Sequence, residues 1–129
     1  MTTGKRLHRL ADVVVPLPWT KPPLSQNDRQ HHHVKAKLVS AALGEARQAI
    51  RTRGLPPVAG ANVTLHYRVA DKRRRDADNL AVVLKVCLDA LVAEGVLPDD
   101  SWVHCPHAGM TIHPPNGEPA SMWLTLETP

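Results

Sequence analysis

A dense run of charged residues occupies the middle of this 129-residue chain. It begins with Arg73-Arg74-Arg75-Asp76-Ala77-Asp78 and continues through Lys85 and Asp89 to the pair Asp99-Asp100. Like charges gathered this closely repel one another unless a cation or a polyanion neutralises them. Carboxylates bind hard metal ions and arginines bind phosphate, so the pattern indicates the chemistry of a metal-dependent nuclease.

The spacing of the acids suggests how they would meet. If Asp76 and Asp78 are still extended where a strand runs out, the two-residue period points both carboxylates to the same side. Asp78, Lys85 and Asp89 are separated by seven and four residues, which places them on one polar face of a helix. Asp99 or Asp100 would then fold back over that face as a third oxygen ligand. Such a cage suits Mg²⁺, and we expect Mn²⁺ to substitute.

Each of these residues also has a purely structural interpretation. Asp76 and Asp78 would serve as a turn residue and a helix cap, and Lys85 with Asp89 as an ordinary surface ion pair. We favour the ion pair for Asp89, but assign Lys85 to catalysis. Arginines beside acids at a strand end favour a phosphate clamp over a merely solvated charged run.

Composition favours nucleic acid as the partner. The net charge is +4, and ten of the sixteen cationic residues are Arg, which binds phosphate through two hydrogen bonds at once. Aromatic residues make up only 3% of the chain and Phe is absent, which argues against a base-stacking platform. Cys87 and Cys105 occur without a signal peptide or a long apolar segment. We therefore expect a cytoplasmic protein with no disulfide and no membrane span.

The order of the elements predicts the fold class. Residues 34–53 and 78–94 have helical periodicity, and Gly54 and Gly95 are placed to end these helices. Strands are expected at 13–15, 62–69, 102–112 and 120–126, with a turn at 114–117 joining the last two. The length permits one domain, residues 1–129. We expect an α+β domain with a mostly antiparallel or mixed sheet and two main helices.

The central segment resembles a known protein family. The residues Arg73-Arg74-Arg75-Asp76-Ala77-Asp78-Asn79-Leu80, followed by Leu84-Lys85, Leu88-Asp89-Ala90-Leu91, Gly95-Val96 and Asp99-Asp100, resemble the RusA family of Holliday-junction resolvases of phages and prophages. Residues 22–29 also resemble that family's Pro-Pro-Ser-Asn-like loop, so the likeness spans most of the chain. The lysine stands seven residues after the second aspartate here, against four in the best-known members. Both spacings return to the same helix face.

The resemblance implies specific roles. Asp76, Asp78 and Asp100 correspond to the metal-binding aspartates, Lys85 to the catalytic lysine, and Asn27 to a loop asparagine of the family. The remaining DNA contacts are expected from the basic side chains Arg29, Lys72, Arg73, Arg74 and Arg75.

The expected function is a Mg²⁺-dependent endodeoxyribonuclease that resolves four-way DNA junctions by paired nicks. It would act as a homodimer, because two opposed nicks need two active sites related by a two-fold axis. Val82 and Val86 are expected at the dimer surface, and no small-molecule cofactor is expected. Two alternatives stay open: a nuclease for flaps or forks, and a non-catalytic DNA-binding regulator.

Overall fold

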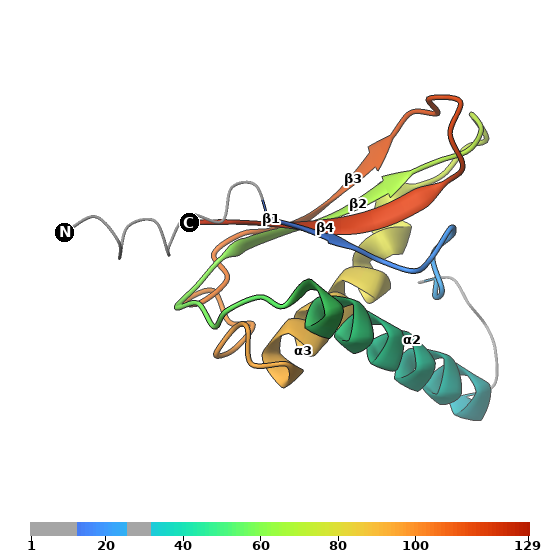
Figure 1. The fold of residues 1–129 in the computed structure, drawn as a ribbon. Coiled ribbons are helices and arrows are strands. Elements are labelled where there is room, and N and C mark those ends of the chain that lie inside the picture. Colours follow the sequence, from blue (N-terminus) through green and yellow to red (C-terminus); the bar gives the residue numbers. More distant parts are fainter. Residues whose placement is uncertain (1–12, 26–31) are drawn as a thin grey trace.

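A four-stranded mixed sheet, covered on one face by two helices, forms the framework of the protein (Figure 1). The computed structural model describes residues 13–25 and 32–129, without the side chains of His32 and Asp78. The strand order is β1-β4-β2-β3, and β4 is antiparallel to both of its neighbours. The strands are β1 (Val13–Pro16), β2 (Asn62–Arg68), β3 (Ala108–His113) and β4 (Ser121–Glu127). The predicted α+β class, with two main helices on one mixed sheet, is confirmed.

β2 and β3 are parallel neighbours, and the chain between them carries the second helix. A parallel pair needs such a crossover, because a tight turn cannot return the chain to the same end of the sheet. The segment after β2 passes through a short 3₁₀ helix, η1 (Ala77–Leu80), directly into α3 (Ala81–Ala93). The charged residues of interest therefore lie in the crossover connection.

The predicted turn at 114–117 does join β3 to β4, but the two strands are not neighbours. β2 lies between them, with Arg68 paired to His113 on one side and to Ser121 on the other. Turn residues such as Gly117, which has a φ of 84°, show where the chain reverses. They do not show which strand it joins, because the hydrophobic pattern of β4 suits either neighbour.

The predicted strand at 102–112 is also too long, since β3 begins only at Ala108. Upstream of it, the backbone N–H groups of His104 and Cys105 both donate to Ser101 O, which closes a local turn. The carbonyl of His104 lies against Gly60, where an added Cβ would stand only 2.8 Å from that oxygen. This close approach holds the turn against the start of β2.

Both helices end at the predicted glycines. α2 (His32–Arg53) stops at Gly54, and α3 stops before Gly95, both of which have positive φ values near 70–76°. After α3, Gly95 N donates to Val92 O and Val96 N donates to Leu91 O, the pair of bonds that defines a Schellman cap.

The core lies between the helices and the covered face of the sheet. Alternate residues of β2, namely Val63, Leu65 and Tyr67, are buried there, as the two-residue period predicts. From α2, the side chains of Ala42, Ala46 and Ile50 are buried, whereas Val34 at the first turns is exposed. The amino-terminal part of α2 therefore diverges from the sheet (Figure 1).

The second helix is more deeply enclosed. Cys87 is buried, as expected for a small apolar residue, and this burial raises the pKa of its thiol to about 12. Val86 is buried as well and Val82 is partly buried, so the prediction that this pair forms an exposed dimer surface is wrong for Val86. α3 is apolar on two sides because both sides are covered within the chain.

Candidate functional site

The first acid of the motif lies immediately before the second helix. Asp76 O accepts a hydrogen bond from Asn79 N at 3.1 Å, which starts the 3₁₀ turn that continues into α3. The expectation that Asp76 and Asp78 continue an extended strand is wrong, because β2 ends at Arg68 and Asp78 lies within η1. The side chain of Asp78 lies outside the described residues. α3 itself has Leu80 at its N-cap, without a capping side chain.

Lys85 of α3 connects two other acids of the motif. Its Nζ lies 2.6 Å from Asp100 Oδ2 and 3.0 Å from Asp89 Oδ1. The Asp100 hydrogen bond, followed by that of Asp89, raises the pKa of Lys85, and the same Lys85 contact lowers the pKa of Asp100. Both groups are therefore held in their charged forms.

The two consecutive aspartates after α3 have different contacts. Asp99 Oδ1 accepts the backbone N–H of Asp100 at 2.9 Å, so Asp99 shapes the turn. Asp100 instead directs its carboxylate to Lys85. Of the two acids, Asp100 is the one gathered with the other residues of the motif.

Two small hollows flank the loop segment that contains Leu24 and Ser25. One, of about 270 Å³, is lined by Asp76, Asn79 and Arg74, and the other, of about 220 Å³, by Lys85 and Asp89. Leu24 and Ser25 line both. Asp76 and Lys85 therefore lie on opposite sides of one loop segment. The neighbouring positions Asn27 and Arg29, expected to contact DNA, lie outside the described residues.

The arginines do not share one environment. The Arg74 side chain is 89% exposed, with its Nε 3.5 Å from Asp76 Oδ1. The Arg73 side chain is 80% exposed, and its Nε donates to both carboxylate oxygens of Asp71. Arg75 is only 20% exposed, and its guanidinium bonds Asp71 O and Arg73 O. Arg75 therefore holds the loop in shape, which leaves Arg73 and Arg74 presented to solvent. Lys72 is also exposed.

The donor chemistry of the motif is compatible with a hard divalent cation, which prefers carboxylate oxygens. The Asp76 side chain is 55% exposed, and Arg74 Nε lies 3.5 Å from its Oδ1, so its oxygens are accessible from solvent. Among the described side chains, which omit Asp78, no three Asp, Glu, His or Cys residues gather as a metal-binding group. Asp76, Asp78 and Asp100 are the residues that would hold such an ion.

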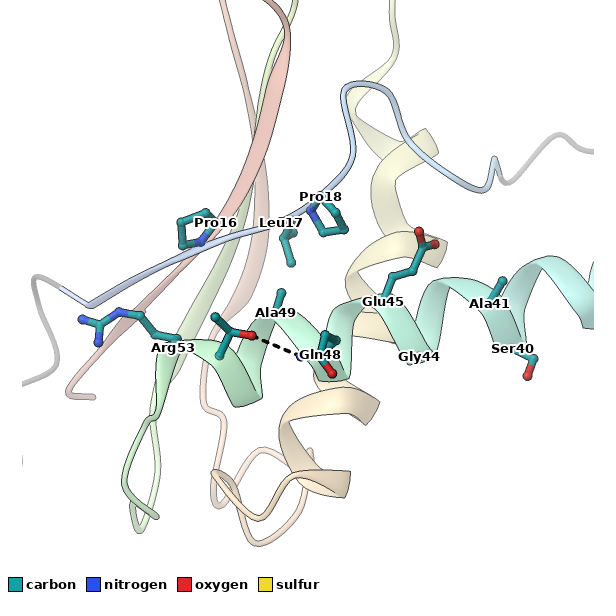
Figure 2. A pocket seen from close by; sticks show the side chains of 11 residues that line it. Pro16, Leu17, Pro18, Ser40, Ala41, Gly44, Glu45, Gln48, Ala49 and Arg53 are labelled. Carbon is teal, nitrogen blue, oxygen red and sulfur yellow. Dashed lines mark hydrogen bonds between the residues drawn. The ribbon is translucent and has the colours of Figure 1, made fainter.

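A larger hollow lies elsewhere on the described surface. A groove of about 850 Å³ runs between residues 16–18 and α2. Figure 2 shows Gln48, Ala49 and Glu45 of α2 facing this groove. None of the charged motif residues lines it, so it contributes nothing to the site described above.

Sequence reasoning missed a cluster of rings on the face of the sheet opposite to the helices. His66 of β2, His113 of β3 and Trp123 of β4 have nearly parallel rings, with all three centroid pairs 5.1 Å apart. The two-residue period places His66 on that face, but the partners become visible only once the strand order is known.

No known family model matches this chain, and neither does any curated protein. Within residues 13–25 and 32–129, neither helix is both long and apolar enough to cross a membrane.

Proposed function

We propose that this chain is a metal-dependent endonuclease that cuts branched DNA, with the four-way junction as its substrate. The observation that carries the proposal is the contact of Lys85 with Asp100, beside the hollow lined by Asp76 and Arg74. It brings Asp100, from the loop after α3, to Lys85 of α3, and the hollow that holds Lys85 shares Leu24 and Ser25 with the hollow lined by Asp76.

The proposed roles follow from the charges of these side chains. Asp76, Asp78 and Asp100 would hold Mg²⁺, which when bound supplies a Lewis acid for phosphodiester hydrolysis. Lys85 keeps its proton, because its two carboxylate partners raise its pKa. A fixed ammonium group stabilises the extra negative charge that develops on phosphate oxygens in the transition state. Arg73 and Arg74, which are exposed, would bind the flanking phosphates.

The proposed substrate, a four-way junction, and the proposed oligomeric state both come from the resemblance to the resolvase family. Paired nicks in a junction require two active sites, so the proposal includes a homodimer with a two-fold axis. The compartment in this proposal is the cytoplasm of a bacterial or phage-infected cell, where DNA is accessible.

The test is cleavage of synthetic DNA by the purified chain. A four-way junction, a fork, a flap and a linear duplex of matched sequence are each incubated with Mg²⁺, with Mn²⁺, or with a chelator. We expect paired nicks in the junction, only with metal, and little cleavage of the duplex. If the fork or the flap is cleaved faster than the junction, that branched DNA is the substrate and the junction is not. Metal-independent binding without any cleavage would favour a DNA-binding regulator instead.

A further inference from the structure

The face of the sheet turned away from the helices carries a cluster that the proposed chemistry does not use. His66 connects it, since its Nδ1 lies 2.8 Å from His113 Nε2 and its Nε2 lies 2.8 Å from Thr125 Oγ1. Trp123 pairs with His66 across the β2–β4 ladder, and the two rings are within 3° of parallel. The guanidinium of Arg68 lies 5.6 Å from the centroid of the Trp123 ring. We call these four residues, His66, Arg68, His113 and Trp123, the ring cluster.

The ring cluster is only partly buried, and neither helix lies over it. By strand register, the β2, β3 and β4 neighbours on the same face are the small residues Thr64, Gly109, Thr111, Ser121 and Thr125. On the β1 side, Pro16 pairs with Trp123 and Val14 pairs with Thr125, so apolar side chains border the rings there. The partly exposed rings and these apolar neighbours offer a surface to a flat partner.

The ring cluster adjoins the exposed cations of the charged motif. His113 lines a hollow of about 390 Å³ together with Lys72, Arg73 and Pro114, and Arg68 donates to Pro114 O. The acid on the same face, Glu127, pairs with Asn62 at the opposite end of β2 from Arg68. Asp71 also lines this hollow, where it pairs with Arg73 and Arg75, but the cations Lys72, Arg73 and Arg75 outnumber it. Positive charge is therefore in excess at the end of the sheet from which residues 71–75 continue.

We propose that the ring cluster binds unpaired nucleotides of DNA, with a base lying against Trp123 and its phosphates directed towards Lys72 and Arg73. Every base has a π face, so stacking on an indole needs no particular sequence. The adjoining cations match the phosphates in charge, and a guanidinium near the ring adds a cation–π contribution. This inference rests on the proposed function, for which it supplies a binding site for the unpaired nucleotides that an open branch point exposes.

Burial is the main cause that lowers the pKa of both His66 and His113; Arg68 lowers the pKa of His113 further, and Glu127 opposes the shift of His66. Both rings are therefore neutral near pH 7, so one N–H can bridge the two imidazoles without charge repulsion. The neutral pair holds both imidazole rings stacked against the Trp123 ring.

The test compares the affinities of the full chain for a labelled oligo-dT strand and for a duplex, by fluorescence anisotropy. Trp123→Leu keeps an apolar side chain in the strand but removes the π face. We expect it to weaken oligo-dT binding about tenfold and to leave duplex binding within about twofold. Trp123→Tyr should restore most of the affinity. The matched control is Trp102→Leu, because Trp102 is 79% exposed in a loop before β3; it should change neither affinity.

Equal oligo-dT affinity in wild type and Trp123→Leu would overturn the inference, and so would an equal loss for single strand and duplex. Absence of oligo-dT binding by the wild type would also overturn it, while metal-dependent junction cleavage would still decide the proposed function separately. If Trp123→Leu does not fold, the indole fluorescence of the Trp102→Leu protein is measured instead. Quenching by oligo-dT and not by duplex supports stacking, and no quenching contradicts it.

Discussion

At the scale of single residues, Lys85 has two carboxylate partners, one from its own helix and one from a different part of the chain. Asp89 lies one turn along the same helix, in the spacing of an ordinary surface pair, whereas Asp100 comes from the loop after α3. The sequence predicts the first contact from spacing alone. The second depends on the path of the chain after Gly95: the loop position predicted that Asp99 or Asp100 folds back over this face, and the resemblance to a family selected Asp100.

Substitution at these positions separates catalysis from ion pairing. Lys85→Ala should lower the single-turnover rate of junction cleavage by at least ~10-fold, because a cation on developing phosphate charge contributes roughly 3 kcal/mol. Asp89→Ala should be nearly silent in the same rapid-quench measurement, since an exposed pair contributes about 0–1 kcal/mol to stability and nothing to the chemistry. Equal, small effects of both substitutions would reduce Lys85 to half of an ion pair.

The proposed metal ligands make a second prediction. Asp76→Asn should abolish cleavage while junction binding is kept or strengthened, because the change removes a ligand and also reduces repulsion of phosphate. Asp78→Asn should behave in the same way. Cleavage is measured at ordinary Mg²⁺ and binding by gel shift in a chelator. Glu118→Gln, which removes an exposed charge from the turn before β4, is the control and should leave cleavage intact. Normal turnover in Asp76→Asn would show that Asp76 is not a metal ligand.

At the scale of elements, the two helices are joined by a charged contact at their carboxyl-terminal ends. Glu94, which follows α3, accepts hydrogen bonds from Arg47 and Arg51 of α2. The side chain of Glu94 is only 12% exposed. These two partners, Arg51 first, lower the pKa of Glu94 from 4.5 to about 2.

The stabilising effect of this contact should depend on pH. A carboxyl whose pKa is lowered by folding stabilises the native state fully above its unfolded pKa of 4.5, and loses this contribution as the pH falls towards about 2. Glu94→Gln should therefore unfold at a lower temperature than wild type at pH 7, and the difference should shrink steadily on acidification. Circular dichroism melts at several pH values measure it, with Glu118→Gln as an exposed control. A difference that stays constant with pH would show that the charge of Glu94 is irrelevant.

Local patterns predicted the extents of the elements better than the pairing of the strands. Periodicity and the two glycines set the extents of both helices to within a few residues, because a helix satisfies its hydrogen bonds locally. The strand predicted at 120–126 agrees with β4 to one residue, but the one at 102–112 was too long and the two are not neighbours, since strand partners are distant in the chain. Ser101 closes a turn that shortens β3, and the residues of that turn resemble strand residues in composition.

At the scale of the whole molecule, the distribution of cations predicts how DNA affinity responds to salt. Arg73 and Arg74 are exposed, whereas Arg75 is engaged by its own loop. Arg73→Ala with Arg74→Ala should weaken binding to every DNA sequence and reduce the slope of log affinity against log salt by up to ~2, as expected from counterion release. Titrations of several sequences across a salt series measure this. A loss confined to one sequence would instead mean that these arginines read bases.

Arg75 provides the comparison within the same segment. Because its guanidinium bonds Asp71 O and Arg73 O, Arg75→Ala should lower thermal stability or disorder the loop, rather than remove a single phosphate contact. The sequence predicted one function for three consecutive arginines. Their separate roles depend on which of the three side chains turns inward. Three identical residues in a row have no pattern from which the inward-turned side chain could be predicted.

The strand order also has a consequence for the sequence of events during synthesis. β4 is the last of the four strands in the chain, yet it pairs with both β1 and β2. The unit of β2, α3 and β3 is contiguous and can assemble as soon as it has left the ribosome, whereas β1 must wait for a partner more than a hundred residues downstream. Until residues 121–127 emerge, one side of β2 is an open edge, and this nascent intermediate is where a chaperone would be needed.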